Sequence, residues 1–112
     1  MTDDKEVARR EKRILTRALC TYGKEVQMWK FVEELGELIT AMARMRISEL
    51  SPQQERGNER DNLAEEIADA GITAEYAIET YGIKDMVRRW RHTKCARLKT
   101  RMEGENARAK PL

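Results

Sequence analysis

Two short stretches of the sequence place carboxylates in patterns that suit metal chemistry. FVEELGELITAMAR (residues 31–44) and NLAEEIADAGI (residues 62–72) both read as buried helices except for their acids. Those acids are Glu33, Glu34, Glu37, Glu65, Glu66 and Asp69. Burying a carboxylate is costly unless a cation sits beside it. Oxygen-only clusters suit the hard cations Mg²⁺ and Mn²⁺, which can hold a polyphosphate and activate water.

On a helical wheel, each stretch sets one pair of carboxylates on the shoulder of an apolar arc. Glu34 and Glu37 form the first pair, and Glu66 and Asp69 form the second. Residues three apart on a helix are neighbours, so each pair shares one face. Two such helices packed antiparallel are expected to bring all four carboxylates together. The remaining two acids point about 100° away, toward solvent: Glu33 and Glu65.

Two polar residues lie beside the first pair on the same helix face. Gln27 stands two turns before Glu34 and is a candidate for contact with a base edge. Lys30 stands four residues before Glu34 and is a further candidate for substrate binding. Both are therefore predicted to contact a substrate held at the carboxylates.

A magnesium site is one of several arrangements that could account for these acids. All six could be solvated faces of acidic helices, and this alternative stays open. A di-iron bundle needs a Glu-x-x-His on each of two helices, but the single histidine, His92, has no glutamate three residues before it. A zinc site lacks His and Cys ligands in the same way. No phosphate loop of the G-x-x-x-x-G-K-[ST] type occurs, so a nucleotide would be held through metal and side chains.

The chain that must position these residues reads as four helices in one domain. The predicted helices span residues 3–20, 24–46, 61–80 and 84–103. Each of the two TYG triplets supplies a glycine suited to ending a helix, and residues 47–60 carry the turn signals of a loop. The tail, residues 103–112, has no periodicity and is expected to be loose. The predicted fold is all-α: a single domain, residues 1–112, in which antiparallel helices form a four-helix-bundle-like metal site.

Composition points to a thin aliphatic core. Of the 112 residues, 40% are hydrophobic but only 5% are aromatic, and 38% are charged. A chain of this length buries roughly 65% of the surface that its unfolded form exposes. The second predicted helix is apolar over two adjoining faces, so its excess apolar surface predicts a homo-oligomer, a homodimer or a homotetramer.

Charge is unevenly distributed, although the net charge is only +2. Residues 33–79 hold 12 acidic against four basic residues, and residues 84–110 hold ten basic against three acidic ones. The two isolated cysteines favour a reducing compartment, and no apolar run has the length of a membrane span. We therefore expect a cytoplasmic protein with no membrane partner.

Two motifs in this order resemble the signature of a known family. EELGE (residues 33–37) followed by EIAD (residues 66–69) is similar to the E-E-x-x-E … E-x-x-D pattern of the all-α nucleoside triphosphate pyrophosphohydrolases, the MazG-like group. Relatives of that group are the dimeric dUTPases and the phosphoribosyl-ATP pyrophosphatases. The likeness extends upstream through YGKEVQMWKFVEELGEL and downstream to KCARLKTR, and it covers roughly residues 22–101.

The resemblance implies a helical bundle that hydrolyses an NTP or dNTP between the α and β phosphates, with Mg²⁺ as cofactor and Mn²⁺ as a substitute. It implies four metal ligands: Glu34, Glu37, Glu66 and Asp69. Glu33 would support the metal or orient the water, while Lys94 and Arg97 would neutralise phosphate charge. The 28 residues between the two motifs, from Glu37 to Glu66, are many for this family. They imply an added flap over the substrate at residues 47–60.

Two non-enzymatic alternatives stay open. The basic C-terminal helix could contact nucleic acid, but only Trp90 is available there for base stacking, which makes nucleic acid the weaker expectation. The chain could also be a structural oligomer whose acidic helices perform no reaction. Metal-dependent release of pyrophosphate separates the enzyme from both alternatives.

Overall fold

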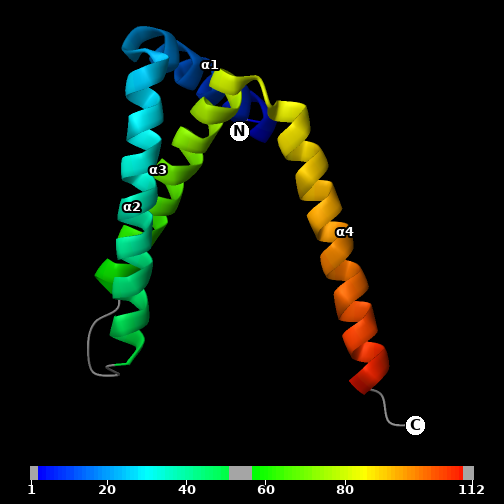
Figure 1. Cartoon of the computed structure of the whole chain (residues 1–112). Helices are drawn as coiled ribbons and strands as arrows, with labels where there is room; N and C mark the ends of the chain where they lie inside the picture. The colour runs from blue at the N-terminus through cyan, green and yellow to red at the C-terminus, as the bar shows by residue number, and fades with distance from the viewer. Residues whose placement is uncertain (1–2, 51–56, 110–112) are drawn as a thin grey trace. The chain divides into compact units, whose positions relative to one another are not determined.

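The helical content of the chain agrees with its sequence. A computed structural model describes residues 3–50 and 57–109 (Figure 1). Within these residues there are four helices and no strand: α1 (Asp4–Tyr22), α2 (Lys24–Glu49), α3 (Gly57–Tyr81) and α4 (Lys84–Ala109). The prediction of an all-α chain is confirmed. No described helix is both long and apolar enough to cross a membrane.

The helices extend further than the sequence patterns predict. α2 continues to Glu49 and α3 already begins at Gly57, so both ends of the predicted loop 47–60 are helical. The middle of that loop, residues 51–56, lies outside the described residues, as do the last three residues of the predicted tail. α4 continues to Ala109, beyond its predicted end at 103. The sequence there, rich in Glu, Ala and Arg, has the propensity to continue a helix without an apolar stripe.

Two glycines end helices, as predicted from the TYG triplets. Gly23 has φ +92°, and its N–H donates to the carbonyl of Leu19 at 3.0 Å, which closes the last turn of α1. Gly82 has φ +63° and follows the last residue of α3. Glycine adopts such positive φ values without steric cost, so both turns are encoded locally. At the other end of α1, the carboxylate of Asp3 accepts from the backbone N–H of Lys5.

The chain divides into two compact units. The first unit, Met1–Thr80, contains α1, α2 and nearly all of α3, and the second unit, Tyr81–Leu112, contains α4. In the first unit α1 packs against α2, and α2 lies alongside α3 (Figure 1). The single domain predicted over residues 1–112, and its bundle-like arrangement, stay predictions.

The buried face of α2 is polar or small along its length. Four residues of α2 are buried at a spacing of seven: Gln27, Glu34, Ala41 and Ser48. A period of seven keeps one narrow face of a helix turned toward one neighbour. The buried residues of α3 are Ala70, Thr73 and Tyr76. We call these two sets of residues the polar seam.

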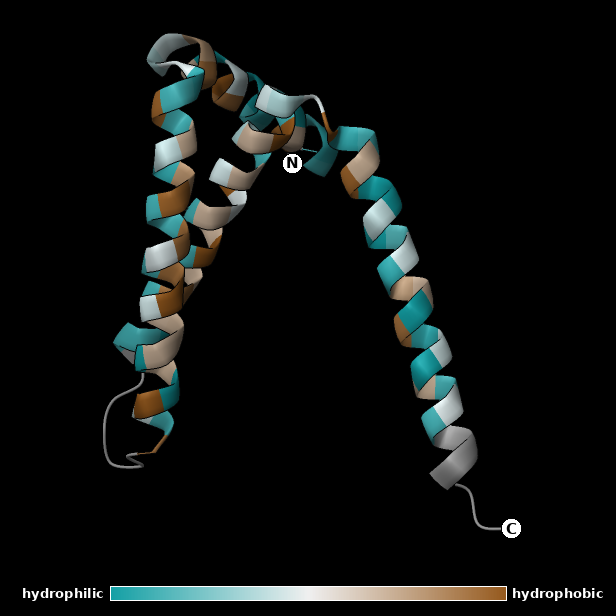
Figure 2. Ribbon diagram, in the orientation of Figure 1, coloured by the Kyte–Doolittle hydropathy of each residue, from teal (hydrophilic) through white to brown (hydrophobic). Residues whose placement is uncertain are grey.

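Apolar side chains occupy the flank of α2 beside the polar seam rather than the seam itself. Val32, Leu35 and Ile39 belong to the apolar arc of α2, and all three are exposed, Ile39 by 71%. Ile67 on α3 is likewise 54% exposed. The brown, apolar positions recur along α2 and α3 in Figure 2. The prediction that these arcs form the buried face is met only in part, since Ala70 of α3 is buried whereas these four residues are exposed.

Candidate metal centre

Three carboxylates from α2 and α3 converge at Glu34 of the polar seam. Glu34 and Glu37 of α2 and Glu66 of α3 each contribute one oxygen, and these three oxygens all lie within 4.8 Å of one another. We call these residues the carboxylate trio. Three like charges this close repel one another strongly unless a proton or a cation lies among them.

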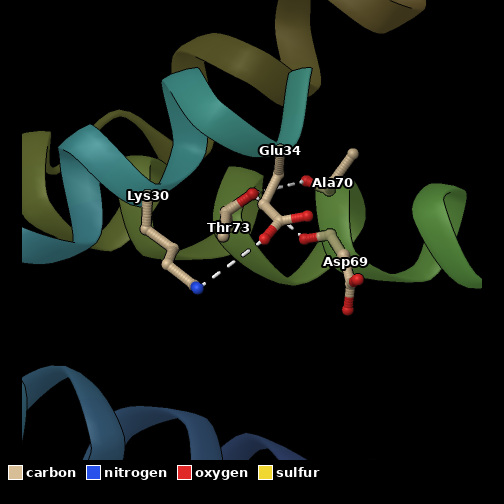
Figure 3. A network of polar contacts seen from close by, with 5 residues as sticks. All are labelled: Lys30, Glu34, Asp69, Ala70 and Thr73. Carbon is tan, nitrogen blue, oxygen red and sulfur yellow. Dashed lines mark hydrogen bonds and ion pairs between the residues drawn. The ribbon is translucent and has the colours of Figure 1, made fainter. Parts of the chain in front are cut away.

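Antiparallel packing of α2 on α3 is what brings the trio together. Glu34 projects from α2 toward Asp69, Ala70 and Thr73 of α3 (Figure 3). One turn later on α2, Glu37 meets Glu66, which lies earlier on α3. Contacts nearer the C-terminus of α2 are therefore made with residues nearer the N-terminus of α3, which defines an antiparallel pair. The sequence predicted this arrangement from the two motif pairs.

Glu34 is the most confined member of the trio. Its side chain is only 7% exposed, and its Oε2 is buried without a hydrogen-bond partner among the described residues. The nearest cation, Lys30, places its Nζ 3.9 Å from Oε1, too far for a hydrogen bond. The Thr73 hydroxyl donates instead to the main-chain carbonyls of Asp69 (3.0 Å) and Ala70 (3.2 Å). Lys30 thus forms a long ion pair with one oxygen of Glu34, while the other oxygen has no partner among the described residues (Figure 3).

This confinement changes the ionisation of the trio. Burial raises the pKa of Glu34 from 4.5 to about 7, repulsion by Glu37 and Asp69 adds to the rise, and Lys30 opposes it. Burial also raises the pKa of Glu66, again with repulsion from Glu37. The Oε2 atom of Glu66 is buried without a partner as well. Without a cation, Glu34 is therefore partly protonated near neutral pH.

The remaining predicted site residues of the first unit lie around the trio. Asp69 is next to Glu34 and acts on it electrostatically, but its carboxylate is not among the three converging oxygens. Gln27 is buried in the polar seam, seven residues before Glu34. Glu33 is exposed and lines a cavity beside the trio. The four-ligand set predicted from the resemblance thus has three members gathered and Asp69 beside them.

Two predicted phosphate-binding residues lie in the second unit. Lys94 and Arg97 of α4 both flank the ring of Trp90, with the Lys94 Nζ and the Arg97 Cζ each 6.0 Å from its centroid. A cation over an aromatic ring is held by the ring quadrupole. Both side chains therefore have an attractive contact within α4 itself.

One feature of the site was missed at the level of sequence. A cavity of about 360 Å³ opens beside the trio between α2 and α3. Its lining residues are Glu33, Gly36, Glu37, Thr40, Ala41, Arg44, Asn62 and Glu66. Arg44 was not predicted to belong to the site. The one signal in the sequence was its spacing, because it follows Glu37 by seven residues and so returns to the same helix face.

The donor set fits a hard divalent cation. All three converging atoms are carboxylate oxygens, and two of the three residues carry a buried oxygen that lacks a partner. Carboxylate oxygens are the ligands that Mg²⁺ and Mn²⁺ prefer, and no histidine or cysteine joins the trio. A cation there would satisfy the orphaned oxygens and remove the repulsion. Comparison of the chain with models of known protein families, with curated proteins and with solved structures found no match.

Proposed function

We propose that this chain is a Mg²⁺-dependent nucleoside triphosphate pyrophosphohydrolase, which releases pyrophosphate and leaves the monophosphate. One observation carries the proposal: Glu34 is buried with an unpartnered oxygen where two further carboxylates converge on it. A chain does not maintain such a costly arrangement for solubility, since exposed acids would serve that purpose. The two motifs that resemble the MazG-like signature support the same assignment.

The trio would hold the cation, with Asp69 beside it as the fourth acid of the motif pattern. When bound, a divalent cation supplies charge neutralisation for phosphates and lowers the pKa of water. Side chains of the protein would hold the substrate in position relative to the carboxylate trio. Gln27 and Lys30 lie on the same side of α2 as Glu34, and they support binding of the nucleotide there.

Glu33 is the residue proposed to accept the proton of the attacking water. It is exposed at the cavity beside the trio and lies next to Glu34 in the chain, a position from which its carboxylate would accept a proton. In the proposed reaction the water oxygen bonds to the α-phosphorus, and the bond from that phosphorus to the bridging oxygen breaks. Pyrophosphate leaves with that oxygen, and the water proton passes to Glu33.

A direct test is a panel of NTPs and dNTPs, canonical and modified, assayed for pyrophosphate release with Mg²⁺, with Mn²⁺ and with a chelator. We expect release for at least one substrate and none when the metal is removed. Release of single phosphate in place of pyrophosphate would contradict the proposed bond cleavage. A complete lack of turnover with every substrate would overturn the proposed activity.

The proposal includes a cytoplasmic homo-oligomer, a homodimer or a homotetramer. The exposed apolar flank of α2, which includes Val32 and Ile39, supports this because a second copy would cover it. A symmetric contact between two copies of α2 is the simplest arrangement that hides the same surface on both chains. The polar seam with its carboxylate trio would remain a contact within one chain, between α2 and α3.

A second candidate function rests on α4. Trp90 is 55% exposed and has two cationic neighbours on its own helix, Lys94 and Arg97, a combination that suits a stacked base and a phosphate. A helical nucleic-acid-binding protein would show a salt-sensitive shift with DNA or RNA and no dependence on Mg²⁺. A structural oligomer would bind Mn²⁺ without releasing pyrophosphate or binding nucleic acid.

A further inference from the structure

The cavity beside the carboxylate trio is lined by one positively charged side chain, that of Arg44. The described ion pairs join different residues, so within the described part of the chain Arg44 has no acidic partner. Helical side chains lean toward the helix N-terminus. This tendency favours a guanidinium directed toward Glu37, whose backbone lies two turns, or about 10 Å, earlier on α2.

Gly36 lines the same cavity without adding a side chain to its wall. It lies inside α2, where glycine costs about 1 kcal/mol relative to alanine. A Cβ built on Gly36 meets nothing within 4 Å, so no neighbour in the described chain requires its absence. Its φ is not positive either, so the backbone does not require glycine. Glycine at this position leaves the cavity wall without a side chain, which gives more room to a molecule that enters the cavity.

The charge of the cavity decides what can enter. Its three glutamates, Glu33, Glu37 and Glu66, outweigh Arg44, so without metal the cavity repels anions. A divalent cation held by the trio would reverse that balance on one side of the cavity. An occupant would then meet a metal at one end and a guanidinium at the other. A chain of phosphates is the chemistry that satisfies both ends, because its oxygens bind hard cations and accept bidentate hydrogen bonds from arginine.

We propose that Arg44 binds the phosphate chain of the ligand across this cavity and that Gly36 leaves the room for it. This inference rests on the proposed function, since it requires a divalent cation at the trio. It assigns the phosphate-positioning role within the first unit to a residue of α2, in addition to the basic residues of α4. Asn62 and Thr40, which also line the cavity, supply neutral hydrogen-bonding groups along its wall.

The test is calorimetric binding of inorganic tripolyphosphate in saturating Mg²⁺, with Mn²⁺ binding measured separately in the absence of phosphate. We expect Arg44→Gln to weaken tripolyphosphate binding by at least about tenfold, as loss of a charge-assisted hydrogen bond predicts. Arg44→Lys should recover part of that loss, and Mn²⁺ affinity should not fall in either variant. The matched control is Arg60→Gln, which removes an exposed arginine of α3 that lies outside the cavity.

Gly36→Val places a branched side chain on the cavity wall and should weaken tripolyphosphate binding while leaving Mn²⁺ binding in place. Its control is Gly104→Val on α4, where an added Cβ likewise meets nothing. If Gly36→Val lowers helicity, Gly36→Ala gives the smaller steric change in a better helix former. A parallel titration with a non-hydrolysable nucleoside triphosphate shows whether the ligand is a nucleotide or a free polyphosphate.

The outcomes separate this inference from the function beneath it. Failure of the wild-type chain to bind Mn²⁺ would overturn the proposed metal centre and this inference with it. Mn²⁺ binding together with tripolyphosphate binding that is equal in wild type, Arg44→Gln and Arg60→Gln would overturn the role of Arg44 alone. Mn²⁺ binding without any tripolyphosphate binding would also overturn this inference and leave the metal centre standing.

Discussion

The carboxylate of Glu34 links the protonation of the site to the folding of the chain. In the unfolded chain this group has its ordinary pKa of 4.5, whereas burial raises it to about 7 in the folded chain. Between those two values the folded state holds a proton that the unfolded state has released. Stability of the metal-free protein must therefore fall as pH rises through this window.

We expect the metal-free protein to be more stable at about pH 5 than at about pH 8. The shift of Glu34 corresponds to at most roughly 3 kcal/mol, since one pKa unit is worth about 1.4 kcal/mol. Chemical denaturation in a chelator at both pH values measures the difference. Saturating Mg²⁺ should shrink or reverse it, because the cation replaces the proton. If the denaturation midpoint of the metal-free protein were the same at both pH values, the raised pKa of buried Glu34 would be contradicted.

Replacing the charge without changing the shape of the side chain gives an independent test. Glu34→Gln should raise the stability of the metal-free protein at about pH 8, by roughly 1–3 kcal/mol, because one repelling charge is gone. It should also abolish Mn²⁺ binding and pyrophosphate release. Glu65→Gln is the matched control, since Glu65 is an exposed acid of α3 outside the trio. Equal effects of the two substitutions would mean that the assigned helix phase is incorrect.

At the scale of single elements, the turn between α1 and α2 depends on one backbone conformation. Gly23 has φ +92° and ψ 150°, a region that side-chain-bearing residues essentially avoid. Gly23→Ala should therefore cost about 1–3 kcal/mol of unfolding free energy. Gly104→Ala, inside α4, should be neutral or slightly stabilising by the helix propensity scale. Thermal melts of the two variants compare the same chemical change in two backbone settings, and equal losses would argue against a special turn.

The elements were largely predictable from sequence because their signals are local. The TYG triplets located two helix ends, and the motif spacing placed Glu34 and Glu37 on one face of α2. Which face of α2 would be buried did not follow from the apolar periodicity. The arc that includes Val32 and Ile39 is exposed in the described chain, whereas the seven-residue series of polar and small residues is buried.

The reason lies in what periodicity measures. An apolar arc shows which side of a helix avoids water, but the surface that covers it can belong to the same chain or to another copy. The spacing of seven from Gln27 to Ser48 was present in the sequence, yet polar residues at that period read as a solvated face. Arg44 was missed for the same reason, since a single arginine in a helix carries no signal until the cavity is seen.

At the scale of the whole molecule, the exposed apolar flank of α2 predicts the state of association. Ile39→Lys places a charge in the middle of that flank and should shift the protein toward a monomer, because an interface cannot bury an unpaired ammonium cheaply. Light scattering at micromolar concentration measures the change. Ala68→Lys, at an exposed position of α3, is the control and should leave the oligomer intact. A wild-type protein that is already monomeric at that concentration would contradict the proposed assembly.

Few apolar residues are deeply buried in the described chain: Leu19, Ala41, Ala70 and Tyr76. Burial of apolar surface is the main favourable term in folding and contributes about 25 cal/mol per Å². These four residues supply little of that buried surface. In the proposed oligomer, contact between chains would supply further apolar burial, and folding and assembly would then form one equilibrium. Dilution would then shift the equilibrium toward the unfolded chain, and the melting temperature should rise with protein concentration.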